Sequence, residues 1–102
     1  MSGVHTFQVD FNELVEPDLV LLSKADQRED ETGQLVALAK GMLINVWEAD
    51  LNERGKRDDL IASGVVVRNK TRGWASDVRW ACRIDDQGIR HMSESAPGSR
   101  LR

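Results

Sequence analysis

Hydrophobic side chains near the start of the chain recur at every second position. Phe7, Val9 and Phe11 alternate with Gln8 and Asp10. Successive side chains of a β-strand point to opposite faces, so a period of two predicts a short strand with one buried face. The first regular element is therefore expected to be a strand that contributes phenylalanine side chains to a core.

The longest alternation lies within residues 73–85, GWASDVRWACRID. Four apolar side chains fall on one face: Val78, Trp80, Cys82 and Ile84. The positions between them carry mostly charged side chains: Arg79, Ala81, Arg83 and Asp85. We expect a half-buried strand in which the cysteine is a small buried hydrophobic side chain, on the face opposite to the arginines.

Five other segments have simpler patterns. Apolar runs at residues 19–22, 60–69 and 89–92 predict strands. Residues 12–16 are expected to form one helical turn before a proline, which cannot continue a helix. Residues 25–34, ADQREDETGQ, have no apolar anchor and predict a solvated loop.

Residues 34–50, QLVALAKGMLINVWEAD, are compatible with two structures. A helical stripe runs through the segment, and a helix over residues 33–54 on an antiparallel sheet would give an α+β fold. Gly41 lies in the middle, however, and would cost such a helix about 1 kcal/mol. The β-branched and aromatic residues that follow it favour strand. We therefore favour a strand with a corner at this glycine.

The expected architecture is five or six short strands joined in sequence by polar turns. Strands that are adjacent in sequence usually pair antiparallel. A meander with glycine corners closes most economically as a small antiparallel all-β barrel of the SH3-like kind. Residues 1–93 are expected to form this single domain, and residues 94–102 a disordered tail with too little apolar content to pack.

The composition agrees with one small globular domain. The chain has 102 residues, of which 40% are hydrophobic and 30% charged. Its single cysteine excludes an internal disulfide and suits a reducing compartment. No early apolar run has the length of a signal-peptide core, and none approaches a membrane span. We expect a cytoplasmic protein that does not associate with a membrane.

Charge is distributed unevenly between the two parts of the chain. Residues 1–60 hold 6 Lys/Arg and 13 Asp/Glu, whereas residues 61–102 hold 8 and 4. Such a split is typical of an anion-binding face, or of two halves that attract each other within one fold. The net charge of -3 lacks the dominant basic field of general nucleic-acid binders.

Two strings carry a resemblance to a known group of proteins. They are KGMLINVWEADLNERGKRDDLIASGVVVRN and, after it, GWASDVRWACRIDDQGIRHMSES. Over about residues 35–95 the chain resembles small bacterial proteins of uncharacterised function, some of them carried on mobile, integron-type gene cassettes. The resemblance implies an SH3-like barrel but no activity and no catalytic residue. The ALYDY-type signature of signalling SH3 domains is absent, so proline-rich ligands are not expected.

The segment from residue 50 begins like a calcium-binding loop. Asp50, Asn52 and Gly55 occupy positions 1, 3 and 6 of an EF-hand pattern. Arg54 at position 5 opposes a cation, and Ile61 stands where a bidentate glutamate is required. The sequence therefore predicts a solvated hairpin loop rather than a metal site.

Catalytic motifs are not found in the sequence. His5 and His91 have no cysteine or second histidine at metal-ligand spacing. The chain also lacks a glycine-rich phosphate loop and a serine nucleophile motif. We expect a protein that is not an enzyme and needs no cofactor or metal.

One stretch combines cations with an aromatic side chain. Within twelve residues around one turn lie Arg68, Lys70, Arg72, Trp74 and Arg79. Such a surface can stack a nucleic-acid base or clamp an acidic peptide. We therefore expect a non-catalytic binding module for an acidic protein segment or a nucleic acid. The tryptophan has a second interpretation, slightly favoured: it folds back and closes one end of the barrel.

Two other classes of function stay open. A pocket in the mouth of the barrel, lined by Trp47 and Glu48, would suit a small ligand or an enzyme. A purely structural subunit would need no ligand. Because small barrels leave strand edges and apolar ends exposed, we also expect a homodimer, with Trp74 or Trp47 at its interface.

Overall fold

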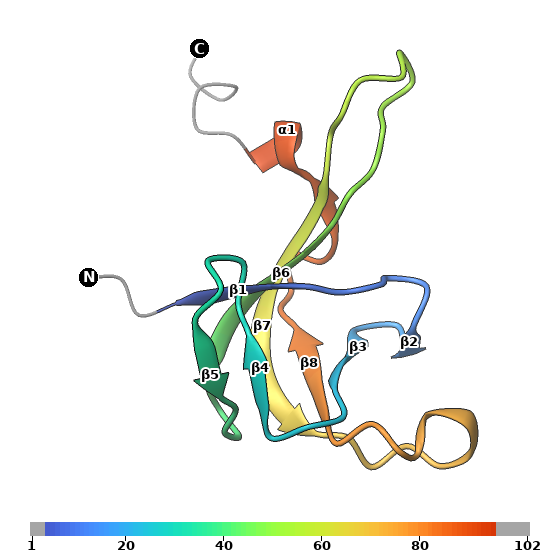
Figure 1. The fold of residues 1–102 in the computed structure, drawn as a ribbon. Coiled ribbons are helices and arrows are strands. Elements are labelled where there is room, and N and C mark those ends of the chain that lie inside the picture. Colours follow the sequence, from blue (N-terminus) through green and yellow to red (C-terminus); the bar gives the residue numbers. More distant parts are fainter. Residues whose placement is uncertain (1–3, 96–102) are drawn as a thin grey trace.

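The computed structural model describes residues 4–95, and Figure 1 shows its course. Most of the predicted tail, residues 96–102, lies outside the described part, and Glu94 and Ser95 belong to the last helical turn. Strands dominate the described residues. In chain order the elements are β1 (His5–Gln8), β2 (Leu14–Glu16), β3 (Leu19–Ser23), β4 (Gln27–Glu29), β5 (Leu35–Ala37), β6 (Leu43–Glu48), β7 (Leu60–Arg68), the 3-10 turn η1 (Gly73–Ala75), β8 (Trp80–Ile84), β9 (Arg90–His91) and α1 (Met92–Ser95).

The strands form one large sheet and one separate hairpin. The large sheet has the order β1-β6-β7-β8-β3-β2, and β9 pairs with the start of β7. β4 and β5 pair only with each other. The all-β prediction is confirmed. The antiparallel prediction is wrong for one pair, because β1 runs parallel to β6. β1 and β2 are the two ends of the path and do not pair, so the sheet is not closed.

The main core lies on one face of the large sheet. The largest fully buried side chains come from five strands: Phe7, Val20, Ile44, Val46, Val66 and Cys82. Val36 of β5 and Leu38 belong to the same cluster, so the β4–β5 hairpin covers this face. The predicted alternation in β8 is confirmed for Trp80, Cys82 and Ile84, which are buried. Val78 precedes the strand and is half-buried.

A smaller apolar layer lies on the opposite face at the centre of the sheet. Ala81 was expected among the charged side chains, but it is fully buried. Its strand partner is Leu21 of β3, which is 5% exposed. Ala75 in η1 is also fully buried and, like these two, lies outside the main core cluster. β8 is therefore covered on both faces near this point, whereas Arg79, Arg83 and Asp85 are not buried and follow the predicted outward pattern.

Two segments differ from the local pattern. Residues 12–16 do not form a helical turn; their second half is strand β2, which pairs with β3. Residues 25–34 are not a solvated loop, because they contain β4 and the tight connection to β5. In both cases a neighbouring strand supplies backbone partners, and such pairing overrides a weak local preference.

Asp30 is the buried charge that holds the β4–β5 connection. Its carboxylate accepts hydrogen bonds from the hydroxyl and backbone N–H of Thr32 (2.6 and 2.9 Å) and from the N–H of Gln34 (3.0 Å). The Nδ1 atom of His5 lies 2.8 Å away. The hydrogen bond from the Thr32 hydroxyl, and then that from His5, holds the pKa of Asp30 well below its usual range. A carboxylate satisfied in this way can be buried as an anion.

Residues 34–50 form two strands, so the alternative helix over residues 33–54 is wrong. Gly41 lies in the turn between β5 and β6 at a φ of +90°, a conformation that favours glycine. Its N–H donates to the carbonyl of Val66 (2.8 Å). Gly41 therefore lies in a turn between two strands, and the prediction of a corner within a single strand is wrong.

The connection between β6 and β7 extends beyond the sheet as a hairpin arm, residues 49–59 (Figure 1). A bridge between Leu51 and Arg57 keeps its two sides paired, and the side-chain oxygen of Asn52 accepts from the N–H groups of Arg54 and Lys56. The predicted hairpin loop is confirmed. β9 and α1 lie beside the base of this arm.

Candidate functional site

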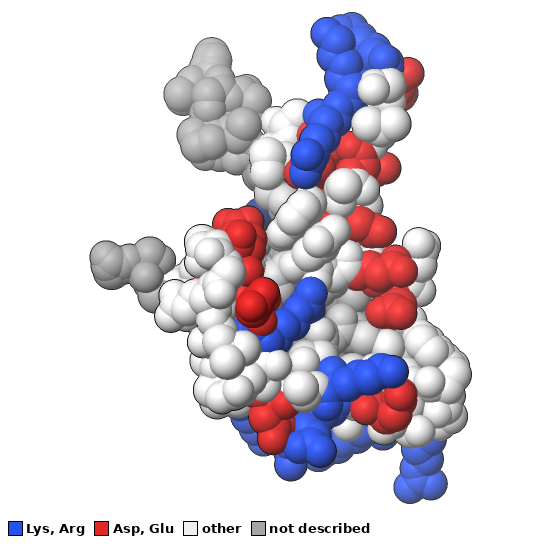
Figure 2. Space-filling model, viewed as in Figure 1, with Lys and Arg blue, Asp and Glu red and all other residues white. Residues whose placement is uncertain are grey.

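The predicted basic residues lie at the end of the molecule opposite the hairpin arm. We call Arg68, Lys70, Arg72, Trp74 and Arg79 the basic end. They come from the last residue of β7, the following loop and the residue before β8. Figure 2 shows lysine and arginine side chains gathered along this lower end of the molecule, with acidic side chains among them. One loop between two paired strands is thus enough to bring the five residues into one region.

Two of these arginines are engaged with neighbouring side chains. The guanidinium of Arg68 lies 5.0 Å from the ring centroid of Trp80. Asp26 accepts hydrogen bonds from the indole N–H of Trp80 (3.0 Å) and from Arg79 (2.9 Å). The Trp80 hydrogen bond, followed by the positive charges of Arg79 and Arg68, lowers the pKa of Asp26. This cluster orders the strand ends and neutralises part of the basic charge.

The other three residues face solvent. Lys70 and Arg72 are exposed and form no ion pair with any residue in the range 4–95. Trp74 is 69% exposed, so the expectation that it closes one end of the fold is wrong. Asn69 holds the loop instead, since its side-chain amide donates to the carbonyls of Ala75 and Val78, both at 2.8 Å. The loop therefore presents an exposed tryptophan shortly after two exposed cations, Lys70 and Arg72.

A wide, open groove of about 860 Å³ borders the basic end. Arg68 and Trp80 line it together with Asp26, Lys40 and Leu35. The leucine is 59% exposed and adds an apolar contact. Sequence reasoning missed these last three residues, because they reach the groove only through the pairing of β3 with β8 and the placement of the β4–β5 hairpin.

Neither the cysteine nor the calcium-like loop has the surroundings of a reactive thiol or a metal cluster within residues 4–95. Cys82 is fully buried, and burial, assisted by the charge of Asp85, raises its pKa to about 12. A thiol with such a pKa is protonated at neutral pH and unreactive. Residues 4–95 contain no group of three or more His, Cys, Asp or Glu side chains that could hold a metal ion.

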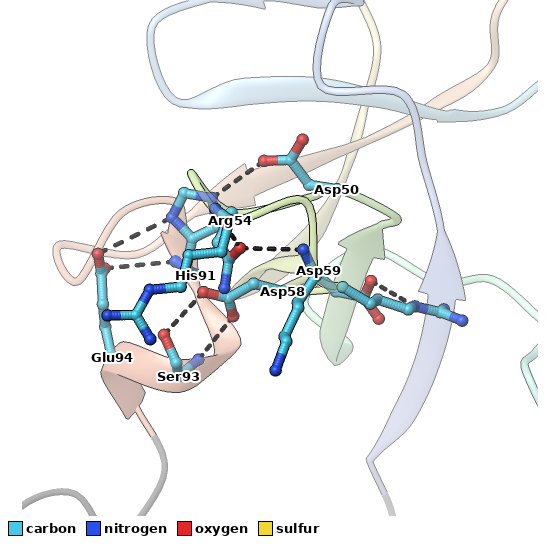
Figure 3. Close-up of polar contacts among 10 residues, drawn as sticks. Asp50, Arg54, Asp58, Asp59, His91, Ser93 and Glu94 are labelled. Carbon is cyan, nitrogen blue, oxygen red and sulfur yellow. Dashed lines mark hydrogen bonds and ion pairs between the residues drawn. The ribbon is translucent and has the colours of Figure 1, made fainter.

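A second polar cluster joins the C-terminal turn to the hairpin arm (Figure 3). The Nε2 atom of His91 lies 3.0 Å from a carboxylate oxygen of Asp50, and its Nδ1 atom lies 3.9 Å from Glu94. The hydroxyl and backbone N–H of Ser93 donate to Asp58 (2.8 and 3.0 Å). The serine is therefore bonded to a carboxylate and not to the histidine, which is not the arrangement of an activated nucleophile. The contacts fasten α1 to the arm.

Protonation of His91 should strengthen this attachment. The hydrogen bond with Asp50, aided by the charges of Asp58, Asp50 and Glu94, raises the pKa of His91. A raised folded-state pKa gives stability that is complete below the unfolded value of about 6.5 and is lost as the pH rises through the folded value. We expect Asp50→Asn to lower the melting temperature more at about pH 6 than at about pH 9.

The matched control for this prediction is Asp86→Asn, because Asp86 is an exposed carboxylate in the turn before β9. Its effect on the melting temperature should not change between the two pH values. An equal loss for Asp50→Asn at both pH values would show that His91 does not bind this carboxylate.

Trp47 and Glu48, which were expected to line one pocket, do not line the same cavity. Trp47 lines a cavity on the outer face of the sheet. Glu48 does not line it, because its carboxylate accepts the backbone N–H of Phe11 (3.0 Å). The two side chains follow each other in β6 and therefore leave the strand on opposite faces.

Comparisons with family models, with curated proteins and with solved structures found no match to this chain. The resemblance to small bacterial proteins with SH3-like barrels therefore stays a prediction. Among residues 4–95, no helix has the length and apolar character needed to cross a membrane.

Proposed function

We propose that the protein is a non-catalytic binding module whose basic end binds an acidic segment of another protein. The observation that carries this proposal is the exposed Trp74 on the same short loop as Lys70 and Arg72, two exposed cations without an acidic partner among residues 4–95. An aromatic ring with neighbouring cations supplies apolar contact area and charge attraction together, as binding hot spots do. The adjoining groove, with Leu35 on its wall, extends the contact surface.

The charge distribution favours a protein segment over a nucleic acid. Asp26 is paired with Arg79, and Asp77 lies 3.1 Å from Lys24, so carboxylates occur within the basic region itself. The whole chain carries a net charge of -3. A long polyanion would be repelled by these charges, whereas a short acidic segment meets only the uncommitted cations.

Fluorescence anisotropy with a labelled peptide rich in Asp, Glu and Leu tests the proposal. We expect Arg72→Glu and Trp74→Ala each to weaken binding at least about tenfold, since one reverses a required charge and the other removes the aromatic contact. Arg54→Glu is the matched control, because it reverses a charge on the remote hairpin arm and should leave the affinity unchanged.

Two results would contradict the proposal. The first is equal peptide binding by all four proteins. The second is tighter binding of single-stranded oligothymidine than of the peptide, with an affinity that falls steeply with salt, which would instead identify a nucleic-acid binder.

Trp74 is also one of the two tryptophans, with Trp47, that the expected homodimer would place at its interface. If a second copy covered this tryptophan, the basic end would not be free for another partner. Sedimentation of the wild-type chain and of Trp74→Ala, at the concentrations of the binding assay, shows whether Trp74 takes part in self-association or is free to bind a partner. Wild-type protein at the monomer mass of 11.4 kDa leaves Trp74 free for the acidic segment. A dimer that dissociates in Trp74→Ala assigns the residue to self-association.

A further inference from the structure

A cavity of about 430 Å³ lies on the outer face of β1, β6 and β7, on the side opposite the main core. Its floor consists of side chains on neighbouring strands. Thr6, Asn45 and Ser63 are consecutive partners across the sheet, and Trp47 and Ile61 are partners further along the strands. This volume is within the range of about 300–1,000 Å³ for small-molecule sites, and the mixture of apolar and polar lining is typical of them.

The charged side chains around the cavity are not all neutralised. Arg57 donates to Asp59 (2.8 Å), whose side chain is only 12% exposed, so that carboxylate is already paired. Arg90 has only a long bond of 3.3 Å to the carbonyl of Gly88, and no carboxylate of residues 4–95 lies within ion-pair distance of it. Glu31 is exposed and adjoins β1, at the other side of the cavity. The side of the cavity nearest β9 thus presents an uncompensated guanidinium.

The Trp47 side chain adds an unused donor. Its indole N–H is shielded from solvent and has no acceptor among residues 4–95. Buried N–H groups are nearly always hydrogen-bonded, so a ligand that supplies an acceptor to the Trp47 indole would satisfy this group. The guanidinium of Arg57 lies 5.7 Å from the ring centroid. The Arg57 side chain is 65% exposed, so it covers the ring from the solvent side.

We propose that this cavity, the Trp47 cavity, binds a small organic anion with a flat apolar body. The body lies against Trp47 and Ile61, and its carboxylate or sulfonate group meets Arg90. Among residues 4–95, the lining contains an indole N–H without an acceptor, that of Trp47, and a guanidinium without a carboxylate partner, that of Arg90. The nearby carboxylate of Asp59 is already paired with Arg57. A ligand that brings acceptors and an apolar face complements both. The site shares no residue with the basic end, so each can be tested alone.

A titration of the ¹⁵N-labelled full chain with 2-naphthoate, followed by NMR, tests this inference. The indole N–H resonance of Trp47, assigned with Trp47→Phe, should shift and saturate. The neutral analogue 2-naphthalenemethanol should bind at least about tenfold more weakly, because it lacks the charge that meets Arg90. Arg90→Gln should weaken naphthoate binding by a similar factor, and Arg90→Lys by less. Arg79→Gln, at the basic end, should leave the affinity unchanged.

The opposite results would overturn the inference. They are shifts confined to the indole resonances of Trp74 or Trp80, equal affinity for the acid and the alcohol, or unchanged binding in Arg90→Gln. The dispersion of the amide resonances in each variant shows directly whether its fold is retained, so a loss of binding is not mistaken for unfolding.

Discussion

Gly64→Ala is expected to destabilise the fold by about 3 kcal/mol, at the upper end of the range for overpacked interiors. Gly64 lies in the middle of β7, opposite Ile84 of β8, and is buried. An added Cβ atom would overlap the carbonyl oxygen of Arg83 and would lie 2.9 Å from the sulfur of Cys82. The carbonyl belongs to the backbone of a central strand, so it cannot rotate away as a side chain could. The two strands would have to separate at this point.

Urea unfolding followed by tryptophan fluorescence measures this loss. Gly55→Ala is the matched control, because Gly55 lies at the tip of the hairpin arm with no atom within contact distance of a new Cβ. Its φ of +76° makes alanine strained there, at a cost of about 1–2 kcal/mol. Gly64→Ala should cost clearly more than this control. If both variants lose the same amount, β7 and β8 do not approach as closely as described.

Phe7→Ala is expected to cost about 3–5 kcal/mol, as is usual when a buried phenylalanine is truncated. The Phe7 side chain has no exposed surface, and Val46 is its parallel partner on β6. The guanidinium of Arg28 lies 5.6 Å from its ring centroid and donates to the carbonyls of Leu22 and Gln8. The ring therefore supports the contact among β1, β3 and β4. Its removal leaves a cavity beneath a half-buried cation.

The same urea experiment with Phe7→Leu separates cavity formation from loss of β1. Leucine retains most of the apolar volume and should cost less than half as much as alanine. A loss below about 1 kcal/mol for Phe7→Ala would mean that β1 contributes little to the core and is detached from β6.

Local patterns predicted the strands that have one face buried. The alternation around Phe7 and Trp80 and the valine run of β7 each identify a strand, because the period of side-chain burial is a property of consecutive residues. The glycine argument also resolved residues 34–50 as strand. The burial of Ala81 could not be predicted in this way, since a strand covered on both faces has no polar alternation.

Pairing between distant segments was beyond the reach of those patterns. The parallel match of β1 with β6 joins His5 to Ile44, and no feature of either strand specifies the direction of the other. The burial of Asp30 did have a local signal. Aspartate two residues before threonine is typical of a turn in which the carboxylate accepts backbone N–H groups, and the Thr32 contact has this form.

In the candidate sites, too, only the features contained in one short stretch of sequence could be predicted. The basic end could be predicted because its five members lie on one short loop and its borders. The ion pair between Arg79 and Asp26 could not be predicted, because the two residues are more than fifty positions apart in sequence. The Trp47 cavity depends on the register between β6 and β7 and on the position of Arg90 beside them, so no single stretch of sequence contains it.

The pairing of β1 and β3 with later strands determines when the chain can fold during synthesis. β6, β7 and β8 follow one another as antiparallel neighbours, and they form the template to which β1 and β3 add. Phe7 and Val20 leave the ribosome early but find their partners, Val46 and Cys82, only after those residues have been made. Until then the first part of the chain keeps its apolar side chains in water. The nascent chain is therefore open to proteases and to mispairing until β8 has been synthesised and has left the ribosome.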